Sequence, residues 1–194
     1  MSNAIEIEAK VLINKEGYEL LSQRFSTYPK FSQTNYYIEN QSGQLQKENL
    51  SLRIREREGL YEVTLKTPLS EGLLEKNCTW TKNDFISFKN GGSFPEGDIK
   101  RFLIMMDIDT STLTIKTKLT TNRIDAPYED GKLSIDENHY CGQVDYEVEL
   151  EHNSQIDAET NLKKLLDSEN IPFIINKKTK TARAFEAFDA NKNK

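Results

Sequence analysis

Charged and apolar side chains alternate in short runs near both ends of this 194-residue chain. Glu6, Glu8 and Lys10 stand two residues apart near the start, and Glu147 and Glu149 do so near the end. Because alternate residues of a β-strand lie on one face, each run predicts a strand with one charged and one apolar face. Such a strand is either a solvated edge or the wall of a site for a highly charged ligand.

The same period of two recurs along the chain and predicts a mainly β protein. Gly59 indicates a hairpin turn, and a second turn is expected at 138–142. The expected strands are residues 5–13, 33–39, 50–58, 61–66, 73–80, 115–125, 132–139 and 143–151. The expected helices follow Asn14 as far as Phe25, follow Thr81 as far as Phe88, and cover 95–106, 157–169 and 179–188. About eight strands with short turns indicate an antiparallel barrel or sandwich with flanking helices, an α+β fold.

Length and composition limit the class of protein. The length suggests one domain, which we place at 5–190, with residues 1–4 as an N-terminal extension or tag remnant. The net charge of −5 gives no electrostatic case for a nucleic acid or an anionic membrane as partner. Cys78 and Cys141 match no metal-binding spacing, so we expect reduced thiols in a cytoplasmic protein.

The charges are sorted by sign from strand to strand. Acidic pairs occur on the first and last expected strands, whereas Arg53 and Arg55 share one face of a middle strand. If these faces line a closed barrel, an acidic wall lies opposite a basic wall, and so much buried charge requires a ligand or ions. Arginine and lysine neutralise phosphate, and carboxylates hold Mg²⁺ or Mn²⁺. A polyphosphate with a divalent metal fits this pattern.

The run Glu6-Ile7-Glu8-Ala9-Lys10 resembles the ExExK signature of the CYTH superfamily, the triphosphate tunnel metalloenzymes. The resemblance extends over nearly the whole chain, although residues 34–37 depart from a common Asp-Thr-Tyr-Tyr-Asp form. Further matches follow in the family's order: Leu52-Arg53-Ile54-Arg55, residues 62–66, Glu75, Arg123 after Thr120, residues 134–136, residues 146–149, and the basic pair Lys180 and Arg183.

The resemblance implies an eight-stranded antiparallel β-barrel tunnel with a charged interior, which hydrolyses the terminal phosphate of a triphosphate with Mg²⁺ or Mn²⁺. It implies phosphate contacts from Lys10, Arg53, Arg55, Lys66, Arg123, Lys180 and Arg183. It implies metal contacts from Glu6, Glu8, Asp136, Glu147 and Glu149. Catalytic roles are expected for Glu147, Glu149 and Lys66, with Glu62, Glu75 and Lys118 as secondary candidates.

Each set also has a plainer interpretation. The acidic faces can be solvated edges, and Arg53 or Arg55 can pair with glutamates on a neighbouring strand. The basic run near residue 178 leaves open whether Lys177, Lys178 or Lys180 faces the site.

Inorganic triphosphate is the substrate that we favour. Thiamine triphosphatases tend to place an aromatic residue just before the Leu-Arg-x-Arg strand, where this chain has Asn49, Leu50 and Ser51. A class IV-type adenylate cyclase would need an adenine pocket, and the sequence has no distinct base-binding motif. A non-catalytic polyphosphate- or nucleotide-binding protein is the remaining alternative. The sequence leaves open whether the chain forms a homodimer.

Overall fold

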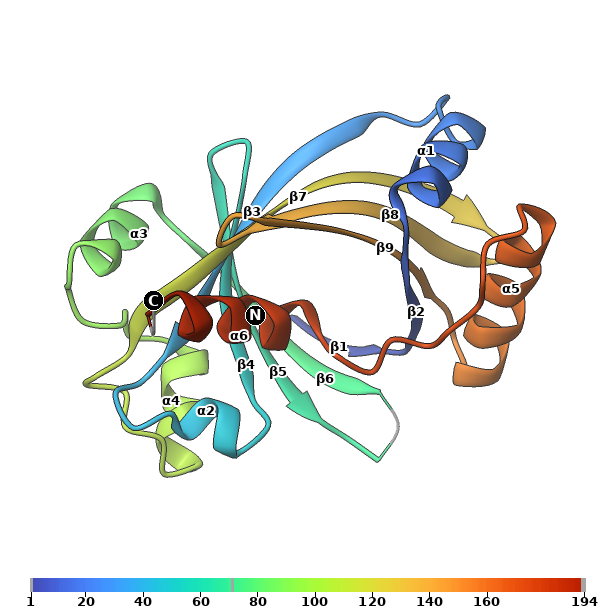
Figure 1. Cartoon of the computed structure of the whole chain (residues 1–194). Helices are drawn as coiled ribbons and strands as arrows, with labels where there is room; N and C mark the ends of the chain where they lie inside the picture. Colours follow the sequence, from blue (N-terminus) through green and yellow to red (C-terminus); the bar gives the residue numbers. More distant parts are fainter. Residues whose placement is uncertain (1, 71, 193–194) are drawn as a thin grey trace. The chain divides into compact units, whose positions relative to one another are not determined.

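A computed structural model of the chain describes residues 2–70 and 72–192 (Figure 1). Within these residues the strands are β1 (Ser2–Glu6), β2 (Glu8–Ile13), β3 (Lys30–Glu39), β4 (Ser51–Arg57), β5 (Leu60–Pro68), β6 (Leu73–Trp80), β7 (Thr114–Tyr128), β8 (Gly131–Tyr140) and β9 (Gln143–Glu151). The helices are α1 (Lys15–Arg24), α2 (Gln44–Lys47), α3 (Lys82–Lys89), α4 (Asp98–Met105), α5 (Gln155–Ser168) and α6 (Lys180–Lys192).

The strands hydrogen-bond in the order β1-β6-β5-β4-β3-β7-β8-β9-β2. The strand pairs whose registers are defined are antiparallel. The predicted mainly antiparallel β class with flanking helices is therefore confirmed. None of the helices in the described part of the chain is both long and apolar enough to cross a membrane.

The chain divides into two compact units, each with its own core. The first unit holds the residues up to Ile5 together with Thr34–Leu119, and the second holds Glu6–Gln33 together with the chain from Thr120 onward. In the first unit, α3 and α4 cover β5 and β6 over a core that includes Ile54 and Leu103. In the second, α1 and α5 pack on β2, β8 and β9 over a core that includes Val11, Ile135 and Val148.

Two tight hairpins set the register of the strands that carry the charged side chains. Glu58 and Gly59 both have positive φ angles, of 53° and 78°, between β4 and β5. Cys141 and Gly142, between β8 and β9, also have positive φ angles, of 48° and 78°. Two consecutive residues with positive φ match the right-handed twist of paired strands, which is why such turns close two-residue hairpins. Both predicted turns are therefore confirmed.

Helix starts follow the expected capping chemistry. The Asn14 side chain accepts a hydrogen bond from Gly17 N at 2.9 Å, and Thr81 forms a reciprocal capping box with Asp84. The short helix α2 is absent from the predictions. Its N-terminal amides bind the buried Glu39 carboxylate, a tertiary contact that periodicity does not reveal.

The first expected strand is divided in the structure. Residues 5–13 were predicted as one strand, but β1 ends at Glu6 and β2 begins at Glu8. The expected apolar face holds for Ala9 and Val11, which are buried, but Ile5 is 63% exposed. β1 pairs with β6, whereas β2 pairs with β9. The chain therefore changes its strand partner at Ile7.

Candidate functional site

Three carboxylate side chains come together in the second unit, and we call Asp136, Glu147 and Glu149 the three-carboxylate cluster. Asp136 on β8 lies opposite Glu147 on β9, and Glu149 follows two residues along β9. Asp136 and Glu147 are fully buried, and the Glu149 side chain is 14% exposed. Ile135 and Val148 belong to the apolar core, so strand alternation directs the carboxylates to the opposite face.

The ammonium group of Lys180, the first residue of α6, lies at the common centre of this cluster. Its Nζ is 2.9 Å from Asp136 Oδ2, 3.0 Å from Glu147 Oε2 and 2.6 Å from Glu149 Oε1. One lysine thus bridges three carboxylates that come from two neighbouring strands.

The neighbouring lysines do not reach the cluster. Lys177 and Lys178 are both exposed, and Lys178 pairs with Glu186 at 2.8 Å. The structure therefore distinguishes Lys180 from the two alternatives that the sequence left open.

Two more cations come from the strands that flank β8 and β9. Arg123 on β7 is opposite Asp136 in the register and donates to both of its oxygens at 2.7 and 2.6 Å. Its Nη2 also donates to Glu149 Oε2 at 2.8 Å. Lys10 on β2 is opposite Glu149, and its Nζ lies 2.6 Å from Glu8 Oε1. The predicted residues Glu8, Lys10 and Arg123 are therefore assembled at one place.

Arg183, one turn after Lys180 on α6, completes the basic set. Its Nη2 lies 2.5 Å from Glu147 Oε2, and its Nε lies 2.9 Å from Asp145 Oδ2. Only 7% of the Arg183 side chain is exposed. Because its two contacts come from the same strand, Arg183 fixes the start of α6 against β9.

Burial and charge have opposite effects on the pKa values of this site. Burial favours the neutral form of Glu149, yet the charges of Lys180 and Arg123 hold its pKa well below the usual range. Burial also works against the charged form of Lys180, but the three-carboxylate cluster raises the Lys180 pKa well above its usual value. Both groups are therefore ionised at neutral pH.

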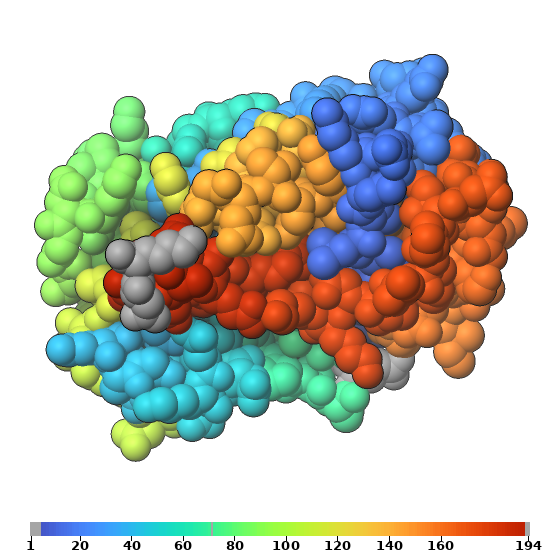
Figure 2. Space-filling model, viewed as in Figure 1, coloured from blue at the N-terminus to red at the C-terminus, as the bar shows by residue number. Residues whose placement is uncertain are grey.

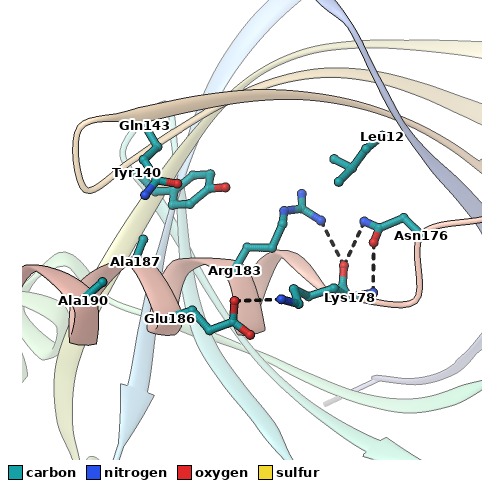
Figure 3. A pocket seen from close by; sticks show the side chains of 9 residues that line it. All are labelled: Leu12, Tyr140, Gln143, Asn176, Lys178, Arg183, Glu186, Ala187 and Ala190. Carbon is teal, nitrogen blue, oxygen red and sulfur yellow. Dashed lines mark hydrogen bonds and ion pairs between the residues drawn. The ribbon is translucent and has the colours of Figure 1, made fainter.

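A cavity of about 530 Å³ lies beside α6, and Arg183 forms part of its wall (Figure 3). Tyr140 and Gln143 of the β8–β9 hairpin line it together with Ala187 and Ala190 of α6. The hairpin and α6 lie side by side on the surface in Figure 2. The Arg183 guanidinium donates to Lys178 O at 2.9 Å and also to the buried Glu147, so the same side chain lines this cavity and contacts the cluster.

The donor atoms of the cluster suit a hard divalent cation in their chemistry, although not in their present spacing. All of its ligating atoms are carboxylate oxygens, which Mg²⁺ and Mn²⁺ prefer to nitrogen or sulfur. Among residues 2–70 and 72–192, no three His, Cys, Asp or Glu side chains are spaced to hold an ion directly. The position where the three carboxylates meet is taken by Lys180 Nζ.

A second charged group lies in the first unit, and we call Arg53, Lys66 and Glu75 the first-unit cluster. Lys66 on β5 is opposite Glu75 on β6, with Nζ 2.8 Å from Oε1. Burial raises the Glu75 pKa, but Lys66 and then Arg53 lower it, with a net decrease. Arg53 Nε is buried and has no hydrogen-bond partner in the described part of the chain.

The remaining candidates lie outside these two clusters. Arg55 Nη1 is 3.8 Å from the half-exposed Glu62, and Arg55 Nε donates to Asn35, so the cross-strand interpretation holds for this pair. Lys118 is exposed on β7, and Glu6 is partly buried at the end of β1.

Three residues of the second-unit site were missing from the sequence predictions. Asp145 stands two residues before Glu147, so the alternation could have identified it. Tyr140 donates to Asp145 Oδ2 at 2.6 Å; burial, followed by this bond, raises the Tyr140 pKa to about 12. Asn176 donates to Glu147 Oε1 at 3.2 Å from a loop in which no sequence pattern marks it.

Comparison with known proteins relates this arrangement to one family. The model of the CYTH domain matches residues 4–185. A Bacillus subtilis protein named "Putative triphosphatase YjbK" is 33% identical over 174 residues, which cover 89% of this chain and 90% of that protein.

Solved structures show the same fold. A Bacillus halodurans protein described as a "putative adenylate cyclase" is 34% identical, with a TM-score of 0.88 over 95% of this chain and 100% of that one. HpAC1 from Hippeastrum, described as an adenylyl cyclase candidate with a dominant triphosphatase activity, matches with a TM-score of 0.76. It is 20% identical, and 96% of each chain is covered, so this likeness concerns the fold alone.

Proposed function

This chain belongs to the CYTH domain family, and from that premise we propose that it is a metal-dependent triphosphatase. The proposed reaction is hydrolysis of the terminal phosphoanhydride bond, with inorganic triphosphate as the substrate. The Bacillus subtilis relative, whose name states a triphosphatase, supports the reaction class.

One observation carries the proposal: three carboxylates converge on a single cation position, and four basic side chains surround them. Fully buried Asp136 and Glu147 are costly unless cations offset their charge. The cations present are Lys10, Arg123, Lys180 and Arg183, and each is also able to bind a phosphate oxygen. A site that joins anionic ligands for a metal with cationic ligands for phosphate suits a metal-loaded phosphate chain.

We propose that Asp136, Glu147 and Glu149 hold Mg²⁺ or Mn²⁺, with Glu8 and Glu6 as further ligands. When bound, such an ion offsets phosphate charge and polarises the bond to the leaving group. Arg123 and Arg183 each present a planar fork of donors, which suits phosphate oxygens and holds the chain in one orientation. Positioning and charge stabilisation supply most of the rate in phosphoryl transfer.

We extend the phosphate-binding role to Arg53 and Lys66 of the first-unit cluster and to Arg55, as the family resemblance implies. Arg53 has a buried Nε without a partner among the described residues, which leaves this donor available for an anion. Lys66 is proposed as a catalytic group through contact with phosphate. The proposal also includes the cytoplasm as the location. Cys78 and Cys141 form no disulfide in the described part of the chain, which is in keeping with a reducing compartment.

A phosphate-release assay tests this function. The purified chain is given inorganic triphosphate, thiamine triphosphate or ATP, each with Mg²⁺ or Mn²⁺ and with EDTA as control. We expect the highest kcat/KM with inorganic triphosphate and no release in EDTA. Chromatography of the ATP reaction detects cyclic AMP, because the Bacillus halodurans relative is described as a cyclase. Cyclic AMP as the main product, or no turnover of any substrate, would contradict the proposal.

A further inference from the structure

The position of Lys180 raises a question that the proposed function does not answer. Its ammonium lies within 3.0 Å of all three carboxylates of the cluster. Mg²⁺ holds carboxylate oxygens at about 2.0–2.1 Å, so an ion bound by the same oxygens needs the space that the ammonium occupies. Two positive charges at one position would also repel each other strongly in a buried site.

We infer that Lys180 is an exchangeable counter-ion, which fills the position of the divalent ion in the three-carboxylate cluster and leaves it when the ion binds. This inference rests on the proposed function only for the identity of the ion. It concerns how Lys180 neutralises the three carboxylates before an ion binds. It holds whether or not triphosphate is the physiological substrate.

The side chains around the cluster are suited to such an exchange. Lys180 is the first residue of α6, and its charge is carried on a flexible four-carbon stem. It can therefore withdraw without a movement of the strands. Arg123 and Arg183 make contacts through two or more nitrogens and are held more firmly. They would keep the cluster neutralised while Lys180 moves.

The exchange has a consequence for binding. The ion must compete with Lys180 in the ligand-free protein, which weakens ion binding. Once displaced, the ammonium is available for a phosphate oxygen near the ion. Binding of the ion and of the phosphate chain then favour each other, and such coupling is reciprocal by thermodynamic necessity.

Titration of Mn²⁺ into the triphosphate-free protein, followed by calorimetry, tests the inference. Lys180→Gln removes the competing charge, and we expect it to bind Mn²⁺ about tenfold more tightly than the wild type, within the usual range of coupling factors. Lys178→Gln is the matched control, because it makes the same charge change on an exposed lysine that pairs with Glu186. It should bind Mn²⁺ as the wild type does. Unchanged or weaker binding by Lys180→Gln would overturn the inference.

A measurement on the wild type removes any dependence on how the variant folds. The protein is treated with an amine-reactive acylating reagent with and without Mn²⁺, and labelling is quantified by peptide mass spectrometry. Lys180, whose side chain is 13% exposed, should become more reactive with Mn²⁺, whereas Lys178, at 52%, should be labelled equally in both samples. Unchanged or reduced labelling of Lys180 with Mn²⁺ would overturn the inference. Failure of the phosphate-release assay would bear on the proposed function alone, because neither measurement contains triphosphate.

Discussion

Glu147 and Glu151 are glutamates of the same strand with very different surroundings. Glu147 is fully buried and contacts Lys180, Arg183 and Asn176, whereas the Glu151 side chain is 42% exposed and pairs with Lys132. A surface ion pair contributes little to the stability of a protein. Removing one partner of a buried, hydrogen-bonded ion pair is strongly destabilising. The environment of each residue therefore decides what a substitution does.

Glu147→Gln should reduce kcat/KM for inorganic triphosphate by at least about 100-fold, or about 2.7 kcal/mol of transition-state stabilisation. The amide keeps the shape of the side chain but removes a charged ligand from the three-carboxylate cluster. Steady-state kinetics with Mn²⁺ measures the effect. Glu151→Gln is the control and should retain wild-type kinetics. An equal loss of kcat/KM in both variants would show that activity depends on the total charge of β9 rather than on the three-carboxylate cluster.

Arg53→Ala should raise KM for inorganic triphosphate at least about tenfold with a smaller change in kcat, the pattern that loss of uniform binding produces. The physical reason is the buried Nε of Arg53, which has no hydrogen-bond partner in the described part of the chain. Arg57→Ala, on the same strand with a side chain 46% exposed, is the control. A KM that stays at the wild-type value in Arg53→Ala would remove Arg53 from the phosphate-binding set.

The element that organises the second-unit site is α6 with the loop before it. Asn176 N donates to Lys10 O at 2.8 Å, and Ile175 forms a bridge with Val11, so the loop is attached to β2. From this anchor the chain reaches Lys180 and Arg183, which lie one helical turn apart and both contact Glu147. The helix thus delivers two cations to one place through its periodicity.

Arg183→Ala should lower the free energy of unfolding by about 3–5 kcal/mol, because it leaves the buried Glu147 and the partly exposed Asp145 without their shared partner. Arg183→Lys should recover part of the loss, since one ammonium cannot reproduce both contacts. Urea unfolding followed by circular dichroism measures the change. Arg101→Ala, in the exposed Asp98–Arg101 pair of α4, should stay within about 0.5 kcal/mol of the wild type. A similar value for both alanine variants would contradict a structural role for Arg183.

Strands and hairpins were predictable because period-two alternation and turn residues are local properties. The alternation in β9 placed Glu147 and Glu149 on one face, and the structure has them there. The break at Ile7 was not predictable, since it arises from a change of strand partner far away in the sequence. The choice of Lys180 over its neighbours likewise depends on where α6 begins, and sequence patterns place helix ends poorly.

Across the whole molecule, a net charge of −5 coexists with a site whose own charges largely neutralise one another. The stability that this site contributes depends on pH through Glu149. Its pKa in the folded protein is well below the usual 4.5, so the folded state favours the ionised carboxylate. This contribution is fully present above pH 4.5 and is lost as the pH falls through the lowered pKa.

The difference in unfolding free energy between the wild type and Glu149→Gln should therefore be largest above pH 4.5 and should shrink as the solution is acidified. The variant lacks the group whose protonation removes the stabilisation, so its own stability should change less over this range. Urea unfolding at several pH values between 2 and 7 measures both curves. A difference that stays constant over the whole range would contradict the lowered pKa.

The pairing of Arg123, Lys180 and Arg183 with their carboxylates also bears on how the protein is made. Zinc fingers remain unfolded until metal arrives, because nothing else holds their ligands together. In this chain the lysine and the two arginines already do so. We therefore expect a newly synthesised chain to fold with these carboxylates in place before any metal ion or phosphate binds.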